Sequence, residues 1–368
     1  MTDTTDPSPA IADDVRGEPN RIGQTSDRSN RADRVRTPVC STTLEVAPSF
    51  QEGRFDALAV DCPFVFSLAG RQGMTFVGWD GIGYQTALTW KQDGQWTAPE
   101  VILPRDPASE VRRYNSALTS IVRDNDLSSP GNLRNFDGWY LGTFHAYPAP
   151  GYEAGPGIIG FVRSRDLVHW EETGERLSPA DGGAWENGGL YKSWLMEHDG
   201  LFYVFYNAKN RDVFGTVAVP PPWVEQTGVA VSSDLSNWRR LQDEPVLRVG
   251  RSGDFDEIFA SDPCVLRDRD RWVMFYFGLA ADGHAREGYA TSDDLVQWEK
   301  SGELLIDVGA AGSIDSTHAH KPAVISWEGR LEHYYCAVAP RSPIRVGDTE
   351  QHEFRGIAKA TSGDVLVD

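Results

Sequence analysis

The chain has few cysteines, no long apolar runs and little positive charge, and each of these features argues against one class of protein. Its 368 residues include 4 cysteines, none in Cys-x-x-Cys spacing, so we expect free thiols in a reducing cytoplasm. No apolar stretch reaches the ~18 residues of a membrane helix and no signal-peptide core is present, so we expect neither a membrane span nor secretion. Lysine and arginine number 35 against 54 acidic residues, and the net charge of −19 argues against nucleic acids and anionic membranes as partners.

What is present is a repeated phrase, which recurs at intervals of 60 to 73 residues. Three copies read Ser-x-Asp-Leu-x-x-Trp and begin at Ser164, Ser232 and Ser292, while degraded copies stand at Asp93 and Asp364. A repeat of this length is one supersecondary unit that buries its apolar face only by stacking on its neighbours. We expect the phrase itself to be structural, with Ser and Asp bonding the backbone of a turn and Trp packing between units.

Each repeat contains the signals of a four-stranded unit. Runs of aromatic and β-branched residues precede each phrase, and the Asp-Gly pairs at 137–138 and 199–200 are typical of hairpin turns. Five such units predict an all-β fold, a five-bladed β-propeller of four-stranded antiparallel blades. The five runs are residues 74–79, 138–144, 201–206, 271–277 and 331–338.

The composition divides the chain into two parts. Residues 1–38 are rich in Asp, Arg, Ser, Thr and Pro and contain no apolar run, so we expect a disordered segment that activity does not need. Residues 39–368 form the predicted propeller, a single catalytic domain. Within it, Leu44–Pro48 is expected to be a strand that closes the ring against the last blade.

The candidate site follows from the fold, because the inner strands of a propeller converge on its central tunnel. In four of the five blades an ionisable group stands just before an apolar inner strand, and Arg113 lies close to the fifth. Burial of unpaired charge is costly, so converging carboxylates, cations and histidines indicate acid–base chemistry rather than core packing. The candidates at these positions are Asp61, Arg113, Asn115, Glu186, Lys192, Glu257, Asp262, His318 and His320.

Several of these phrases resemble one superfamily. Asp61-Cys-Pro63, the run from Asp262 to Asp268, the strand Trp272–Tyr276 and the repeated phrase are similar to those of five-bladed propeller glycoside hydrolases, which include families 43, 32, 68, 117 and 130. The resemblance covers about residues 55–366. It implies hydrolysis of a glycosidic bond by two carboxyl groups. One protonates the leaving oxygen, and the other activates water or attacks the sugar.

The resemblance also implies roles. Asp61 matches the general base or nucleophile and Glu186 matches the general acid, while Asp262 would orient the sugar or tune a pKa. Where families 43 and 32 have an Asp in blade two, this chain has Arg113-Tyr-Asn115, which makes it a divergent relative.

A second group of residues is expected to bind substrate. Trp79 would stack on a sugar ring, Arg113 and Lys192 would clamp a substrate hydroxyl or carboxylate or pair with catalytic carboxylates, and only one of the two histidines is expected to face the tunnel. The predicted binding residues are Trp79, Arg113, Asn115, Lys192, Glu257, His318 and His320.

The predicted function is removal of a terminal sugar, furanosides included, from a small glycoside or oligosaccharide. Two alternatives stay open: a carbohydrate-binding propeller without catalysis, and a phosphorylase or transglycosylase that would hold phosphate with Arg112, Arg113 and Lys321. The expected partner is a small carbohydrate, not a nucleic acid or a membrane, and the sequence indicates no oligomeric state. No cofactor or metal ligand is predicted, although a divalent cation such as calcium near the axis stays open.

Overall fold

The computed structural model describes residues 34–211 and 221–363. The chain divides into two units, Met1–Arg36 and Thr37–Asp368, and all strands of the described residues belong to the second. Residues 1–33 of the segment predicted to be disordered lie outside the described residues, as does Asp364 of the last repeat. Among the described residues no helix is long and apolar enough to cross a membrane.

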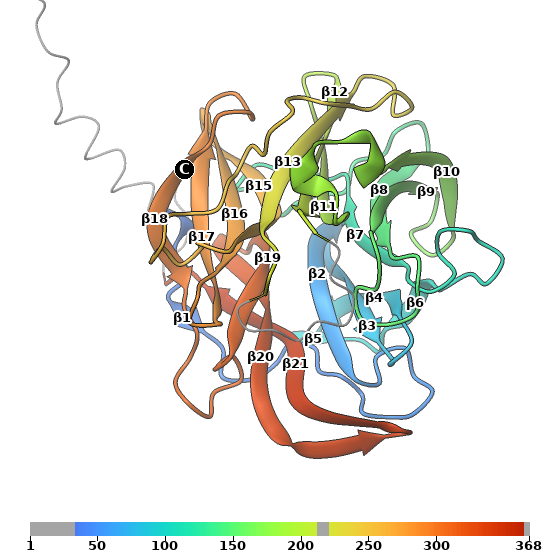
Figure 1. Ribbon diagram of the computed structural model, residues 1–368, viewed down its shortest axis with the longest axis vertical. Coiled ribbons are helices and arrows are strands. Elements are labelled where there is room, and N and C mark those ends of the chain that lie inside the picture. Colours follow the sequence, from blue (N-terminus) through green and yellow to red (C-terminus); the bar gives the residue numbers. More distant parts are fainter. Residues whose placement is uncertain (1–33, 212–220, 364–368) are drawn as a thin grey trace, which may run out of the picture. The chain divides into compact units, whose positions relative to one another are not determined.

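The second unit is the predicted five-bladed β-propeller, with inner strands around the centre of Figure 1 and outer strands at its edge. Blade one comprises β2 (Ala59–Leu68), β3 (Arg71–Trp79), β4 (Tyr84–Gln92) and β6 (Glu100–Leu103), and β5 (Gln95–Trp96) also pairs with β4. Blade two comprises β7 (Ala117–Ile121), β8 (Tyr140–Ala146), β9 (Ile158–Ser164) and β10 (Trp170–Leu177). Blade three comprises β11 (Gly189–His198), β12 (Leu201–Lys209), β13 (Glu225–Ser232) and β14 (Arg239–Arg240). Blade four comprises β15 (Phe259–Asp268), β16 (Arg271–Leu279), β17 (Ala285–Ser292) and β18 (Glu299–Ile306). Blade five comprises β19 (His318–Trp327), β20 (Arg330–Val346), β21 (Thr349–Thr361) and β1 (Val39–Cys40).

The ring is closed by the N-terminal segment of the unit. Strand β1 pairs antiparallel with β21, with Val39 opposite Thr361, and therefore supplies the outer strand of blade five. The predicted closing strand at Leu44–Pro48 is present as a bridge between Val46 and Ile357. This pairing covers the exposed edge of β21, which would otherwise be free to pair with another chain.

The repeated phrase is structural, as predicted. In blade two, Ser164 Oγ accepts a hydrogen bond from Leu167 N (2.9 Å) and Asp166 Oδ1 accepts one from His169 N (2.8 Å). The Asp bond and a Trp Nε1 to Leu carbonyl bond recur in blades three and four. Trp238 of blade three stacks on Phe161 of blade two with ring centres 4.5 Å apart. The phrase therefore ties a turn and packs one blade on the preceding one.

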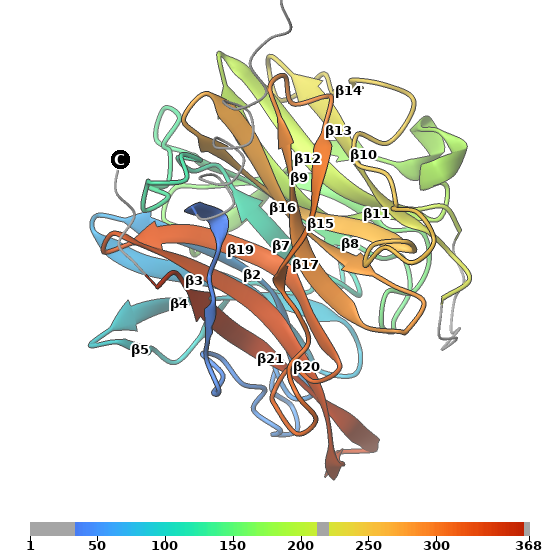
Figure 2. The ribbon, with the colours of Figure 1, turned by 90° about the vertical axis from the view of Figure 1, so that its left-hand side faces the viewer.

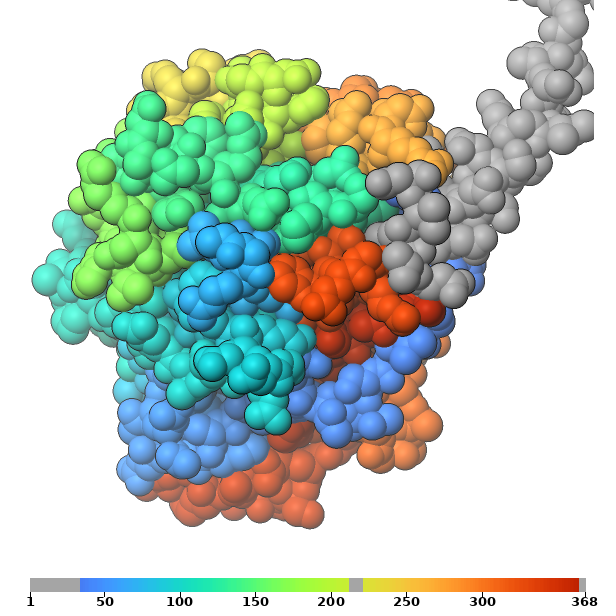
Figure 3. Space-filling view, turned by 180° about the vertical axis from the view of Figure 1, so that it is seen from behind, coloured from blue at the N-terminus to red at the C-terminus, as the bar shows by residue number. Residues whose placement is uncertain are grey.

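The far end of the tunnel is closed by the segment after β7, which lies near the middle of the face in Figure 3. Gly131 O and Ser129 O accept hydrogen bonds from Ser67 N and Ser326 N, the ends of inner strands β2 and β19. Arg123, only 2% exposed, donates to Val65 O (2.5 Å) and Val324 O (2.6 Å). Blades one and five are thus joined by a buried guanidinium that fills the axis.

Each inner strand breaks register near its start, where it approaches the axis. Four of these bulges hold a non-glycine residue at positive φ: Cys62 (48°), Lys192 (22°), Asp262 (58°) and Lys321 (66°). A left-handed conformation costs such residues about 1–3 kcal/mol each and is concentrated at functional sites. The backbone strain is therefore concentrated at one end of the tunnel, the end opposite Arg123, and this end is the better candidate for a functional site.

Strands β20 and β21 continue beyond blade five as a long hairpin, drawn in red at the bottom of Figures 1 and 2. We call its distal part, residues 340–355, the hairpin arm. Val346 is buried at its tip and packs in one cluster with Ala57 and Leu58, and Phe354 lies 6.1 Å from Phe50. The arm is therefore fixed against the segment that leads into blade one.

Candidate active site

A pocket of about 170 Å³ lies where the inner strands begin, at the open end of the tunnel. Its charged lining comes from four blades, and neighbouring blades meet there through the parallel pairs Glu225–Phe259 and Ala285–His318. We call it the axial pocket. It is lined by Tyr152, Glu153, Tyr191, Trp223, Glu225, Phe259, Asp262, Phe277, Leu279, Ala285, His318, His320, Lys321 and Arg355.

Glu225 is the most deeply buried glutamate of this lining. It opens β13 and is 4% exposed, and its carboxyl accepts hydrogen bonds from Trp223 Nε1 (2.8 Å) and Ser261 Oγ (3.2 Å). Burial, and then the charge of Glu153, raise the pKa of Glu225 to about 7. A carboxyl group with this pKa holds a proton near neutral pH, as a general acid must.

Asp262, at the bulge of β15, is the second buried carboxyl group of the pocket. It is 1% exposed, Oδ1 accepts a hydrogen bond from the Asn207 amide, and the Asp262 backbone N donates to Asn207 Oδ1 (2.7 Å). Oδ2 has no hydrogen-bond partner among the described residues. Burial raises the pKa of Asp262 to about 6 despite the nearby Lys192 and Lys321. A buried oxygen without a partner on the pocket wall suits a sugar hydroxyl.

Asp61 lies beside the pocket and is held by two cations that do line it. Its Oδ2 accepts hydrogen bonds from Lys321 Nζ (3.0 Å) and Arg355 Nη1 (3.3 Å), and it is 1% exposed. Burial alone would raise the pKa of Asp61, but Lys321 and Arg355 lower it well below its usual range. The carboxylate is therefore ionised and is covered by its partners rather than open to the pocket.

Both histidines of β19 line the pocket, which corrects the expectation that only one of them faces it. Residues two positions apart in a strand share a face, so His318 and His320 point the same way, with ring centres 5.6 Å apart. Burial lowers the pKa of His318 to about 3 and the pKa of His320 well below its usual value, so both rings are neutral. His318 Nδ1 accepts from Ala285 N (3.1 Å), which leaves its Nε2–H available as a donor.

The structure does not bring Glu186 to this pocket. Glu186 ends a short 3₁₀ turn (Ala184–Glu186) and is fully buried. Its Oε1 pairs with Arg240 Nε (2.7 Å) and accepts a hydrogen bond from Gly183 N (3.0 Å). These contacts tie the turn to the outer strand of blade three.

The predicted binding residues other than the histidines lie outside the axial pocket. Asn115 Oδ1 accepts from Tyr84 N (2.9 Å), and Glu257 accepts from Gly253 N (2.9 Å) and Ala281 N (2.7 Å), so each fixes a loop. Arg113 is exposed, and Lys192 is buried at the bulge of β11. Trp79 lines a separate hollow beside the hairpin arm.

The cations proposed for a phosphate pocket are not gathered in one place. Arg112 pairs with Glu172 (2.6 Å), and neither Arg112 nor Arg113 is part of the axial pocket, whereas Lys321 is. Within the described residues no group of three or more His, Cys, Asp or Glu side chains could hold a metal ion.

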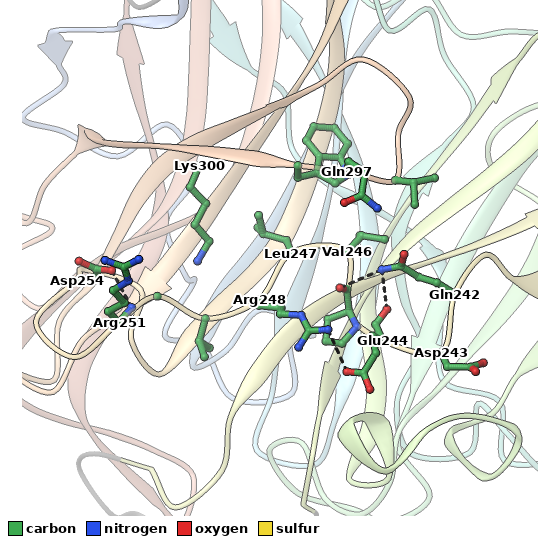
Figure 4. Close-up of a pocket in the computed structure, with 15 residues that line it drawn as sticks. Gln242, Asp243, Glu244, Val246, Leu247, Arg248, Arg251, Asp254, Gln297 and Lys300 are labelled. Carbon is green, nitrogen blue, oxygen red and sulfur yellow. Dashed lines mark hydrogen bonds and ion pairs between the residues drawn. The ribbon is translucent and has the colours of Figure 1, made fainter. Parts of the chain in front are cut away.

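A larger hollow of about 710 Å³ lies between the outer parts of blades three and four (Figure 4). Part of its polar lining is already engaged: Arg248 pairs with Glu244 (3.3 Å), and Asp254 accepts a hydrogen bond from the backbone N of Arg251 (2.7 Å). Lys300 pairs with the buried Asp256 (2.5 Å). It holds no strained backbone and none of the predicted site residues, so the axial pocket is the better candidate.

The sequence prediction missed most of the pocket lining, and four of the missed residues matter for its chemistry: Glu225, Tyr152, Glu153 and Arg355. Glu225 was missed because it opens the third strand of its blade, whereas the prediction considered only the first strands. The apolar run Thr227–Val231 follows it, so the signal used for the inner strands, a charged residue before an apolar strand, was present here too. Tyr152 and Glu153 come from the loop between β8 and β9, and Arg355 comes from β21. No period or motif marks these three.

Comparisons with known proteins agree with this geometry. A solved structure whose description names BT0996 and RGII is 27% identical, with a TM-score of 0.74 over 93% of this chain and 96% of that one. An extracellular exo-alpha-(1->5)-L-arabinofuranosidase of Cellvibrio japonicus is 24% identical over 68% of this chain and 69% of its own length. A 1,2-beta-oligomannan phosphorylase of Thermoanaerobacter is 28% identical over 35% of this chain, and the match spans only 42% of the phosphorylase.

A comparison with models of protein families assigns the chain to a family. Residues 123–339, more than half of the chain, match the family described as "Glycosyl hydrolases family 32 N-terminal domain". This segment runs from Arg123, which closes the tunnel, into β20 of blade five, and it contains Glu225, Asp262 and both histidines. The chain belongs to the glycosyl hydrolase family 32 N-terminal domain family.

Proposed function

We propose that the protein is a glycoside hydrolase that removes one terminal sugar at a time, bound in the axial pocket. The observation that carries this proposal is a group of three carboxyl groups, Glu153, Glu225 and Asp262, around a pocket whose tunnel is closed behind it by Arg123. A pocket closed at one end admits the end of a chain and not its middle.

In this proposal Glu225 is the general acid. Its raised pKa keeps it protonated, so that it donates a proton to the leaving oxygen as the glycosidic bond breaks. Glu153, a partly exposed residue of the same lining, is the second carboxyl group, which activates water or attacks the anomeric carbon. Asp262 and the neutral histidines would bind sugar hydroxyls, with the unpaired Asp262 oxygen as the main acceptor.

Asp61 is then a positioning residue. It holds Lys321 and Arg355 against the pocket, where the charge of Lys321 partly offsets the effect of burial on the pKa of Asp262. The contacts of Glu186 with Arg240 and Gly183 likewise favour a structural role over that of general acid.

The sugar is proposed to be a furanoside, supported by the name of the Cellvibrio relative and by the small volume of the pocket. Phosphorolysis is less favoured, because the two cations of the axial pocket already share Asp61, and the lining also holds the carboxyl groups of Glu153 and Asp262, which disfavour an anion. Hydrolysis by two carboxyl groups requires no cofactor. We also propose a cytoplasmic location, supported by three buried free thiols.

The test is a panel of nitrophenyl furanosides and pyranosides, each assayed with and without phosphate and after dialysis against EDTA. Turnover of one terminal sugar without phosphate supports the proposal. Turnover only with phosphate would favour the phosphorylase, and binding of sugars without any turnover would favour a carbohydrate-binding propeller. Loss of activity on dialysis, restored by calcium, would show that a cation contributes.

A further inference from the structure

A second hollow of about 580 Å³ adjoins the axial pocket. Tyr152 and Arg355 line both, and Arg355 Nη1 donates a hydrogen bond to Tyr152 Oη (3.1 Å) where the two meet. Because Arg123 and its neighbours close the tunnel behind the axial pocket, the rest of a substrate must leave through its mouth. The adjoining hollow is therefore in position to receive it.

The lining of this hollow has the chemistry of a sugar site. The rings of Trp79 and Tyr152 stand nearly perpendicular (86°) with centres 5.6 Å apart and form an aromatic corner. The opposite wall is the hairpin arm, which contributes the amide of Gln351 and the carboxylates of Glu350 and Glu353. Aromatic faces pack against the C–H groups of a sugar, and amides and carboxylates bind its hydroxyls.

The charged side chains of this hollow favour neutral sugars over anionic ones. Glu353 pairs with Arg355 (3.1 Å), and Glu350 pairs with His352 (2.9 Å) in an exposed position. The hollow sets two carboxylates against one guanidinium, that of Arg355, which is also shared with Asp61. The wall thus presents a surplus carboxylate, which disfavours a uronate or a sugar phosphate.

We propose that this hollow is the binding site for the sugar next to the scissile bond, that it takes a neutral sugar, and that the hairpin arm determines this specificity. The inference rests on the proposed function, since it assigns the leaving group of that reaction. The arm is suited to the role because Val346, Phe354 and Arg341 fix it against residues 50–58, so its wall exists before substrate binds.

The test fills the hollow without touching the axial pocket. Gln351→Trp places a large ring at the arm wall, and Arg345→Trp is the matched control, because Arg345 lies on the same arm but does not line the hollow. The substrates are the methyl glycoside and the neutral disaccharide of the terminal sugar that the nitrophenyl panel identifies. A methyl group is too small to fill the hollow.

The expected result is a loss of about tenfold or more in kcat/KM for the disaccharide in Gln351→Trp, with the methyl glycoside within about twofold of the unaltered enzyme and Arg345→Trp normal on both. Equal rates on the disaccharide in the two variants would overturn the inference and leave the proposed function intact. In the unaltered enzyme, faster hydrolysis when the second sugar is a uronic acid would overturn the preference for neutral sugars. No turnover of any glycoside would overturn the proposed function and the inference with it.

Discussion

Lys321 Nζ donates a hydrogen bond to Asp61 Oδ2 at 3.0 Å and so links the inner strands of blades five and one beside the axial pocket. Both side chains are nearly buried, and Arg355 is their third member. The bulges at Cys62 and Lys321 bring the two strands to this arrangement. The contact between blades five and one and the shape of the site therefore depend on the same ion pair.

Replacement of Asp61 by Asn is expected to destabilise the protein by about 3–5 kcal/mol, because it leaves the buried Lys321 without its carboxylate partner, whereas Arg355 keeps Glu353. Urea unfolding measures the change. Asp282→Asn is the matched control, since it breaks an ion pair with Arg286 whose aspartate is half exposed and should cost about 0–1 kcal/mol. Equal small losses in both variants would contradict the importance assigned to the Asp61 pair.

The pH profile of kcat/KM is expected to fall above about pH 7, the pKa of Glu225. The sign follows from the role: a general acid is active while protonated, and burial raises the pH at which its proton is lost. Glu225→Gln cannot lose this proton, so its residual activity should show no decline near pH 7. A decline that persists unchanged in Glu225→Gln would assign it to another group.

Trp238→Ala is expected to cost about 3 kcal/mol, because the ring is stacked on Phe161 of the preceding blade. Activity per folded molecule should stay normal, since Trp238 does not line the axial pocket. Ser236→Ala, in an exposed position of the same phrase, should change the free energy of unfolding by less than about 0.5 kcal/mol. A similar stability for both variants would refute the packing role of the phrase.

Two truncations separate the dispensable part of the chain from the part that closes the ring. A chain that starts at Arg34 keeps the buried Val35 and β1 and should retain normal turnover and melting temperature. A chain that starts at Ser49 lacks β1 and the Val46 bridge to Ile357, so β21 loses its outer partner and the melting temperature should fall. Impaired turnover in the longer chain would show that residues 1–33 serve the site or an assembly.

The blades could be predicted from sequence because their signals are local. Ser164, Asp166 and Trp170 bond and pack within a few residues, and the turn at Asp199 and Gly200 has the positive φ angles (51° and 76°) that this pair predicts. Asp262 and both histidines were found because they open inner strands. Arg355 could not be found this way, because it reaches Asp61 across 294 positions of sequence, and Glu153 stands in an irregular loop.

The separation of Glu186 from the pocket shows the limit of the same reasoning. Its position before β11 fits the pattern of a charge ahead of an apolar strand, but its carboxylate serves Arg240. A carboxyl group of a buried ion pair and a catalytic carboxyl group give the same sequence pattern, a charged residue before an apolar strand. Only the direction of the side chain separates them.

The most direct test of the central claim compares Glu225→Gln and Glu186→Gln on two glycosides of the same sugar, one with a good leaving group such as dinitrophenolate and one with a sugar alcohol. A good leaving group needs no proton from the enzyme. Glu225→Gln should therefore lose about 10²–10⁴-fold in kcat on the sugar glycoside and far less on the dinitrophenyl glycoside. Glu186→Gln should be near normal per folded molecule on both. Equal losses on the two substrates for Glu225→Gln, or the selective loss in Glu186→Gln instead, would contradict the assignment of the general acid to the axial pocket.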